Sequence, residues 1–280
     1  MIRTISILAA SLWLAIPSHA QTGGDGDDSV RRVTVGQVAQ IATPAAMITY
    51  GIISLGNNGI RRLDYDLRND IVRHDAFWHS KAENYAQFAP AAAAFALKGL
   101  GVRNNGGGRG SGAGVGNGWG DMAARYILSN AVAGGIVTVT KHAVGRLRPD
   151  GSNNLSFPSG HTETAFVAAE FLHQEYRDKS VWISVAGYGT AAFVGAARIM
   201  NDHHWLSDVI AGAGVGILST KAVYWGYPYL RKALFPRLSG RSTSAYGSGT
   251  PGPDRSPRTS AILMPGYSDG ALSINFACVF

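Results

Sequence analysis

Two cations in the stretch KHAVGRLRP, residues 141–149, have a spacing that could bind an anion. Lys141 and Arg148 are seven positions apart, nearly two full turns of a helix, so both fall on one face. Pro149 follows Arg148 directly and ends that helix. Two like charges on one face repel each other unless an anion lies between them. The stretch therefore predicts an anion site, with a solvated basic face as the alternative.

The stretch FPSGH, residues 157–161, predicts the start of a helix. Pro158 and Gly160 interrupt regular structure, Ser159 is a good N-cap, and the helical sequence TETAFVAAEF follows. A helix N-terminus offers unpaired backbone N–H groups and the positive end of the helix dipole, which suit an oxyanion or a phosphate. We expect His161 in the first turn, beside any anion bound there. The alternative is an ordinary capped helix with a histidine on its surface.

A third stretch, ARIMNDHHWLSD at residues 197–208, pairs a histidine with an aspartate. Asp208 follows His204 by four positions, one helical turn. A carboxylate placed there accepts the Nδ1–H of the imidazole and leaves Nε2 as a bare lone pair, which is a nucleophile. His203 has no aspartate at that spacing, and Arg198 adds a further cation. A surface His–Asp pair is the alternative interpretation.

A metal site is a second alternative for this third stretch. Its ligands would be Asp202, His203, His204 and Asp208. A pocket that also gathers the cations Lys141, Arg148 and Arg198 would repel a divalent ion, which argues against a metal.

Taken together, the three stretches resemble the type 2 phosphatidic-acid phosphatase family, which also includes bacterial acid phosphatases and vanadium-dependent haloperoxidases. The family pattern is Lys-x6-Arg-Pro, then Pro-Ser-Gly-His, then Ser-Arg-x5-His-x3-Asp. Every spacing fits this chain, and Ala197 replaces the family's usual serine at a position outside its catalytic set. The resemblance covers the motif region 141–208 and the helical sequence around it.

The resemblance implies a role for each motif residue. The catalytic residues would be His204 as nucleophile, Asp208 as its partner and His161 as general acid and base. The phosphate would be bound by Lys141, Arg148, Ser159, Gly160 and Arg198. No cofactor is expected, because fixed cations replace a metal, and vanadate is expected to inhibit.

The function that follows is an exported, metal-independent phosphatase acting on phosphate monoesters or diphosphates through a phosphohistidine, with lipid phosphates among the substrates. One alternative is a vanadium haloperoxidase using the same anion pocket, and another is a non-catalytic anion-binding envelope protein. Nucleic acid is excluded as a partner, since no basic run alternates with aromatic residues. A serine hydrolase is excluded because Ser159 lacks a Gly-x-Ser-x-Gly elbow. Peripheral membrane contact and the oligomeric state stay open.

The elements that must position these residues are helical. Apolar residues recur at helical spacing between about 34 and 232, which predicts an all-α bundle of about six core helices. The predicted helices span residues 34–55, 80–99, 121–147, 160–176, 180–197 and 203–225. Because polar residues, Pro and Gly interrupt each apolar run, we expect core helices of a soluble bundle rather than membrane spans. The charged stretch 61–79, with His74 and His79, is expected to be a solvated connector.

The ends of the chain have a different composition from the middle. Residues 1–20 have the pattern of a secretory signal peptide and 21–33 that of a flexible leader, so we expect a periplasmic or secreted protein. The helical phosphatase domain would then occupy 34–236, followed by a Ser/Gly/Pro-rich linker at 237–260. Period-two alternation predicts a β-hairpin tail at 261–280.

Composition narrows the classes further. The chain has 280 residues, of which 46% are hydrophobic and 15% charged, so it is long and apolar enough for a sizeable core. Its single cysteine, Cys278, excludes an internal disulfide framework. The net charge of +7 is compatible with anionic substrates or an anionic membrane surface and does not distinguish them.

Overall fold

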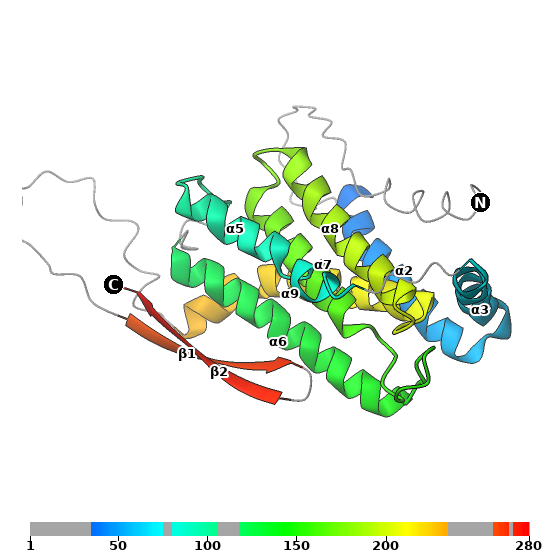
Figure 1. Cartoon of the computed structure of the whole chain (residues 1–280). Helices are drawn as coiled ribbons and strands as arrows, with labels where there is room; N and C mark the ends of the chain where they lie inside the picture. Colours follow the sequence, from blue (N-terminus) through cyan, green and yellow to red (C-terminus); the bar gives the residue numbers. More distant parts are fainter. Residues whose placement is uncertain (1–34, 75–79, 106–117, 235–259, 269–270, 280) are drawn as a thin grey trace, which may run out of the picture. The chain divides into compact units, whose positions relative to one another are not determined.

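The computed structural model describes residues 35–74, 80–105, 118–234, 260–268 and 271–279, and the chain divides into two units, Met1–Gly240 and Arg241–Phe280. The described part of the first unit is all helical, as predicted (Figure 1). Its helices are α2 (Val35–Gly56), α3 (Asn58–Arg73), α4 (Glu83–Ala86), α5 (Ala89–Gly99), α6 (Trp119–Val144), α7 (Gly160–Tyr176), α8 (Val181–Met200) and α9 (Leu206–Leu234). These eight helices replace the six that were expected.

Two differences account for the higher count. The predicted helix 80–99 is divided into α4 and α5, with Pro90 in the first turn of α5, where its missing N–H leaves no helical bond unmade. The expected connector 61–79 is largely helix α3, which begins after Asn57, whose side-chain oxygen accepts the N–H of Gly59 at 2.8 Å. The stretch is a largely exposed, amphipathic helix, which agrees with the solvated surface expected of it, although the helix itself was not predicted. His79 lies outside the described residues.

Helix α7 is the centre of the first unit. It packs against α5, α6, α8 and α9, which enclose it on several sides (Figure 1). Glycines on α9 permit the close approach: a Cβ on Gly212 would lie 2.5 Å from the carbonyl oxygen of Ser159, and one on Gly216 would lie 2.5 Å from that of Glu163. The start of α7 is thereby held directly against the first half of α9.

Among the described residues, four helices are long and apolar enough to cross a membrane. They are the segments Val38–Gly56, Trp119–Val144, Val181–Met200 and Leu206–Ala233. Only 17% of the most apolar window of α2 is buried inside the protein, and 28% of that of α6. Large apolar side chains point outward, such as Val139 at 71% exposure and Trp182 at 74%. These faces support membrane association and correct the expectation of a soluble bundle.

The second unit contains two antiparallel strands, β1 (Ser260–Ser268) and β2 (Ala271–Val279). Their register pairs Ser260 with Val279 and Ser268 with Ala271. Residues 269–270 between them lie outside the described part, so the hairpin remains a prediction. The signal segment 1–20, the leader 21–33 and the linker up to residue 259 also lie outside it, so these domain boundaries stay predictions as well.

Candidate active site

The structure brings the three motif stretches to one end of α6, α7 and α9. The Ser159 N–H donates to the Asp208 carbonyl at 3.0 Å, which joins the start of α7 to the first turn of α9. The Ser156 N–H donates to the Arg146 carbonyl at 2.9 Å, which joins the same loop to the segment after α6. Backbone bonds between stretches far apart in the chain thus fix the relative positions of the predicted residues.

Lys141 lies in the last turn of α6, over the start of α7. Helix α6 ends at Gly145, whose φ of 60° is in the left-handed region that glycine adopts readily. The Lys141 Nζ donates to the Leu155 carbonyl at 2.6 Å, and its Cε lies 3.9 Å from where a Cβ on Gly160 would stand. The ammonium group is therefore beside the N-terminus of α7, as the anion-site prediction requires.

Ser159 and His161 occupy the N-terminus of α7. Ser159 is the N-cap residue and is fully buried, but its hydroxyl lies 2.9 Å from the Thr162 hydroxyl and does not cap a backbone N–H. His161 lies in the first turn and is half-buried. Because the side chain of Ser159 makes no cap bond, it does not compete with an anion for the amide groups of this first turn.

His204 is buried next to Asp208. Its side chain is 1% exposed, and its Nδ1 lies 3.7 Å from Asp208 Oδ2. This distance is longer than a hydrogen bond, so the contact is electrostatic here. Helix α9 begins at Leu206 rather than at residue 203, so the four-residue spacing joins a loop to a helix. The two side chains lie close together, but the predicted hydrogen bond from Nδ1 is not formed at this distance, and the predicted helix start was wrong.

The surroundings of His204 hold its imidazole neutral. Burial lowers the pKa of His204 to about 3, the Asp208 carboxylate opposes that shift, and the cations Lys141 and Arg148 add to it. The ring is therefore uncharged at neutral pH. A proton on Nδ1 would face the aspartate and would leave the lone pair on Nε2.

Arg148 comes from the first motif stretch and Arg198 from the third, and both are predicted to bind the phosphate. The Nε of Arg148 is buried and has no hydrogen-bond partner among the described residues. Arg198 is 5% exposed and lies 3.3 Å from the Glu83 carboxylate of α4. Burial lowers the pKa of His203, and the positive charges of Arg198 and Arg148 lower it further. A buried guanidinium donor without a partner suits an anion.

A cavity of about 360 Å³ opens beside Arg198. Its lining is polar and charged: Ser80, Lys81, Glu83, Asn84, Arg198, Asn201 and His203. The side chain of Asn201 donates to Glu83 at 2.9 Å, which fixes the carboxylate that faces Arg198. Glu83 was not predicted as a site residue, because it lies 115 positions from its partner and belongs to no motif.

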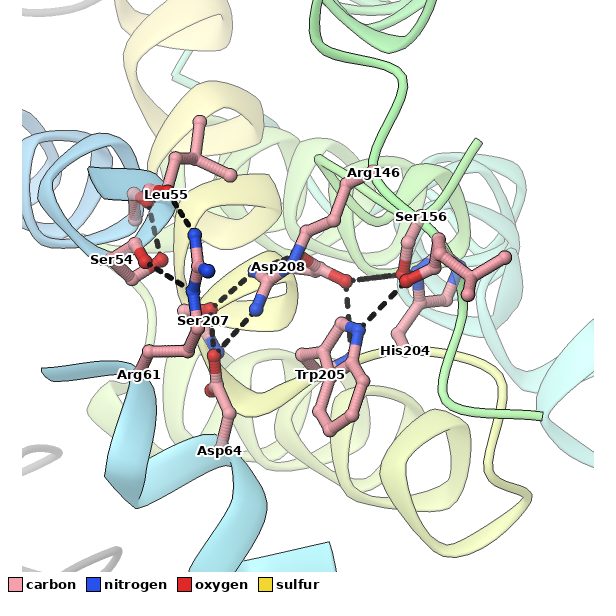
Figure 2. A network of polar contacts seen from close by, with 12 residues as sticks. Ser54, Leu55, Arg61, Asp64, Arg146, Ser156, His204, Trp205, Ser207 and Asp208 are labelled. Carbon is pink, nitrogen blue, oxygen red and sulfur yellow. Dashed lines mark hydrogen bonds and ion pairs between the residues drawn. The ribbon is translucent and has the colours of Figure 1, made fainter. Parts of the chain in front are cut away.

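A second group that the sequence analysis missed surrounds Asp208 (Figure 2). Arg146 Nη1 donates to Asp208 Oδ1 at 2.7 Å, and Arg146 Nη2 donates to Asp64 Oδ2 at 2.7 Å. The Ser156 hydroxyl and the Trp205 N–H donate to the other Asp208 oxygen. Arg146 lies inside the KHAVGRLRP stretch, which was the one available signal.

The alternative of a metal site has no support in the described residues, which contain no group of three or more His, Cys, Asp or Glu side chains placed to hold an ion. Two of its proposed ligands are already engaged by guanidinium groups. Asp202 receives two hydrogen bonds from Arg68 at 2.7 Å, and Asp208 is paired with Arg146. Carboxylates neutralised in this way are poor ligands for a divalent ion.

Comparison with known proteins finds similarity to a phosphatase superfamily and to curated proteins over part of their length. The model of the PAP2 superfamily matches residues 122–232. The lipid A 1-phosphatase of Porphyromonas gingivalis is 34% identical over 239 residues, which cover 80% of this chain and 51% of that protein. The lipid A 1-phosphatase of Rhizobium etli is 33% identical over 146 residues, 40% of this chain and 60% of that protein. This chain thus spans only about half to three fifths of these two relatives.

Two further proteins show similarity to this chain. The bacitracin transport permease protein BcrC of Bacillus licheniformis is 39% identical over 75 residues, 27% of this chain and 35% of that protein. A crystal structure of a transmembrane PAP2-type phosphatidylglycerolphosphate phosphatase from Bacillus subtilis matches with a TM-score of 0.44 and 20% identity, covering 67% of this chain and 96% of that one.

Proposed function

Because the chain belongs to the PAP2 superfamily, we propose that it is a membrane-associated phosphatase that hydrolyses lipid phosphates without a metal, through a phosphohistidine on His204. The observation that carries this proposal is the buried position of the His204 imidazole, 3.7 Å from the Asp208 carboxylate. Burial and the charges of Lys141 and Arg148 lower its pKa to about 3, which keeps the ring neutral. A neutral imidazole surrounded by positive charge is suited to attack a dianionic phosphate.

The cations bind and neutralise the phosphate. Lys141 lies over the start of α7, and Arg148 presents a buried donor that has no partner among the described residues. Arg198 completes the set, with Glu83 fixing its guanidinium. The Ser159 hydroxyl and the Gly160 N–H add uncharged donors at the helix start. Donors fixed in advance stabilise the charge on the equatorial oxygens during transfer.

The first chemical step forms a bond between His204 Nε2 and phosphorus, while the bond from phosphorus to the leaving oxygen breaks. His161 gives its proton to that oxygen, so a neutral alcohol leaves. The imidazole of His204 becomes positively charged as it takes the phosphoryl group. Asp208, 3.7 Å from Nδ1, stabilises that charge.

The second step returns the enzyme to its starting state. His161, now neutral, takes a proton from a water molecule, and the water oxygen attacks phosphorus. The bond between phosphorus and Nε2 breaks, inorganic phosphate is released, and His204 is neutral again. His161 is protonated once more, so protons and charges balance over the cycle.

The substrate class rests on the membrane-facing helices and on the relatives. Two of the similar proteins bear the name lipid A 1-phosphatase, and four helices in the described part of the chain could cross a membrane. We therefore propose a phosphorylated lipid as substrate and the periplasmic side of the membrane as the location. The similarity to lipid phosphatases favours this function over the haloperoxidase alternative.

A phosphate-release assay on the purified protein in detergent tests the proposal. Lipid A, undecaprenyl diphosphate, phosphatidate and a small aryl phosphate serve as parallel substrates. His204→Ala should abolish release from every substrate and eliminate an acid-labile phosphoryl label on the protein. His142→Ala is the matched control, because its ring nitrogen contacts only the Thr138 carbonyl of its own helix. Normal release by His204→Ala would refute the mechanism, and no release by the unaltered protein would support a non-catalytic role.

A further inference from the structure

We propose that Asp64 on α3 and Arg146 after α6 are positioning residues that hold the Asp208 carboxylate in the orientation that faces His204. This inference rests on the proposed function, since it assigns the two residues a role in the same reaction. Neither residue belongs to the motif positions that were predicted to contact phosphate or carry out chemistry.

The hydrogen bonds distribute one guanidinium between two carboxylates (Figure 2). Arg146 Nη1 donates to Asp208 Oδ1 and Arg146 Nη2 donates to Asp64 Oδ2, both at 2.7 Å. Asp64 is held in turn by Ser207, whose N–H donates to Oδ1 at 2.9 Å and whose hydroxyl donates to Oδ2 at 2.7 Å. The side chains of Asp64 and Asp208 are both fully buried.

This sharing determines which oxygen of Asp208 faces the histidine. A guanidinium beside a single carboxylate tends to bind both of its oxygens with two parallel N–H bonds. Here Asp64 occupies Nη2, so Arg146 reaches Asp208 through Nη1 and only at Oδ1. The Oδ2 atom is left for Ser156, for the Trp205 N–H at 3.1 Å and for the imidazole of His204 at 3.7 Å.

Trp205 strengthens the same arrangement from the loop that carries His204. The Arg146 guanidinium lies 5.5 Å from the centre of the Trp205 ring, a cation–π distance. The indole Nε1–H donates to the Leu147 carbonyl at 2.9 Å, next to Arg146 in the chain. The histidine loop and the arginine loop therefore cannot shift independently. Removal of the Asp64 charge frees Nη2 and allows the guanidinium to turn toward Asp208.

A double-mutant cycle tests this inference through phosphate release under saturating and limiting substrate. Asp64→Asn should lower kcat about tenfold or more and change KM less than about threefold, because it disturbs the group that stabilises the imidazolium and not the phosphate cations. In an Asp208→Asn background the same change should alter kcat less than about twofold. Asp66→Asn is the matched control, since Asp66 is exposed on the same helix.

The outcomes separate the two proposals. If Asp64→Asn lowers kcat by the same factor with and without Asp208, while His204→Ala remains inactive, the positioning role is overturned and the proposed function stands. If His204→Ala keeps normal activity, both are overturned. Arg146→Lys, which keeps the charge but loses the two-pronged geometry, carries the same cycle should Asp64→Asn fail to fold.

If Asp208→Asn turns over too slowly to measure kcat, the same double-mutant cycle can be carried out by measuring vanadate binding with titration calorimetry. Vanadate is the anion expected to bind opposite His204, and because the imidazole nitrogen can add to vanadium, its binding draws on the same imidazolium stabilisation as the reaction without any turnover. As a single substitution, Asp64→Asn should weaken vanadate binding about fivefold or more. When Asp208→Asn is already present, adding Asp64→Asn should weaken it less than about twofold. Equal weakening in both backgrounds overturns the positioning role.

Discussion

Asp208→Asn is the substitution that most directly probes the charge relation on which the proposed chemistry depends. It removes one negative charge 3.7 Å from the Nδ1 of His204, where a positive charge develops as the phosphohistidine forms. At that separation, with an effective dielectric constant of about 20, the interaction amounts to about 4 kcal/mol. Since about 1.4 kcal/mol corresponds to a factor of ten, kcat should fall about 10³-fold.

The same substitution should leave substrate binding largely intact. Lys141, Arg148 and Arg198 hold the phosphate in the ground state and are unchanged, so KM should stay within about threefold. Both oxygens of Asp208 accept hydrogen bonds, one from Arg146 and the other from the Trp205 N–H. An asparagine has only one oxygen, so its NH₂ group must face one of these two donors. A donor facing a donor costs about 1–3 kcal/mol of folding free energy, so the variant should be measurably less heat-stable.

Rapid-quench measurement of the phosphoryl burst, beside steady-state phosphate release, separates the first step from the second. The burst rate of Asp208→Asn should fall as much as kcat. Asp178→Asn is the control, because Asp178 forms only a surface pair with Arg177 at 4.0 Å. A fall in kcat of less than tenfold in a folded protein, or a loss confined to KM, would refute the idea that Asp208 stabilises the imidazolium.

Two further predictions concern stability. Burial lowers the pKa of His204 from 6.5 to about 3, so the unfolded chain takes up a proton that the folded protein refuses. The contribution of a neutral His204 to the free energy of unfolding is fully present above about pH 6.5 and is lost as the pH falls toward 3. His204→Asn should therefore make Tm depend less on pH between about 3 and 6.5. Gly212→Ala should lower Tm by about 5 °C, because its Cβ would lie 2.5 Å from the Ser159 carbonyl oxygen. Gly226→Ala is the control and should not lower Tm, because a Cβ there would meet nothing within 4 Å. An unchanged Tm in Gly212→Ala would refute the close contact between α7 and α9.

The local sequence was not sufficient to predict that several helices expose apolar faces on the outside of the protein. Polar residues interrupt α2 and α8, and these interruptions favoured core helices in the sequence analysis. The packing shows that most of the α2 surface is covered by no other described helix, and that Trp182 on α8 points outward. Whether an apolar side chain faces protein or lipid depends on its neighbours in space, so hydropathy along the chain did not determine it.

The sequence by itself determined the helical class, the three motif stretches and the spacing that pairs His204 with Asp208. These features are local, because a spacing of four or seven residues fixes which side chains lie near each other. Only the tertiary structure decided that Asp64 and Glu83 join them. Asp64 lies 82 positions from Arg146 and Glu83 lies 115 from Arg198. Contacts over such separations arise from the packing of whole helices. The sequence around a single acidic residue therefore does not indicate which distant residue it will contact.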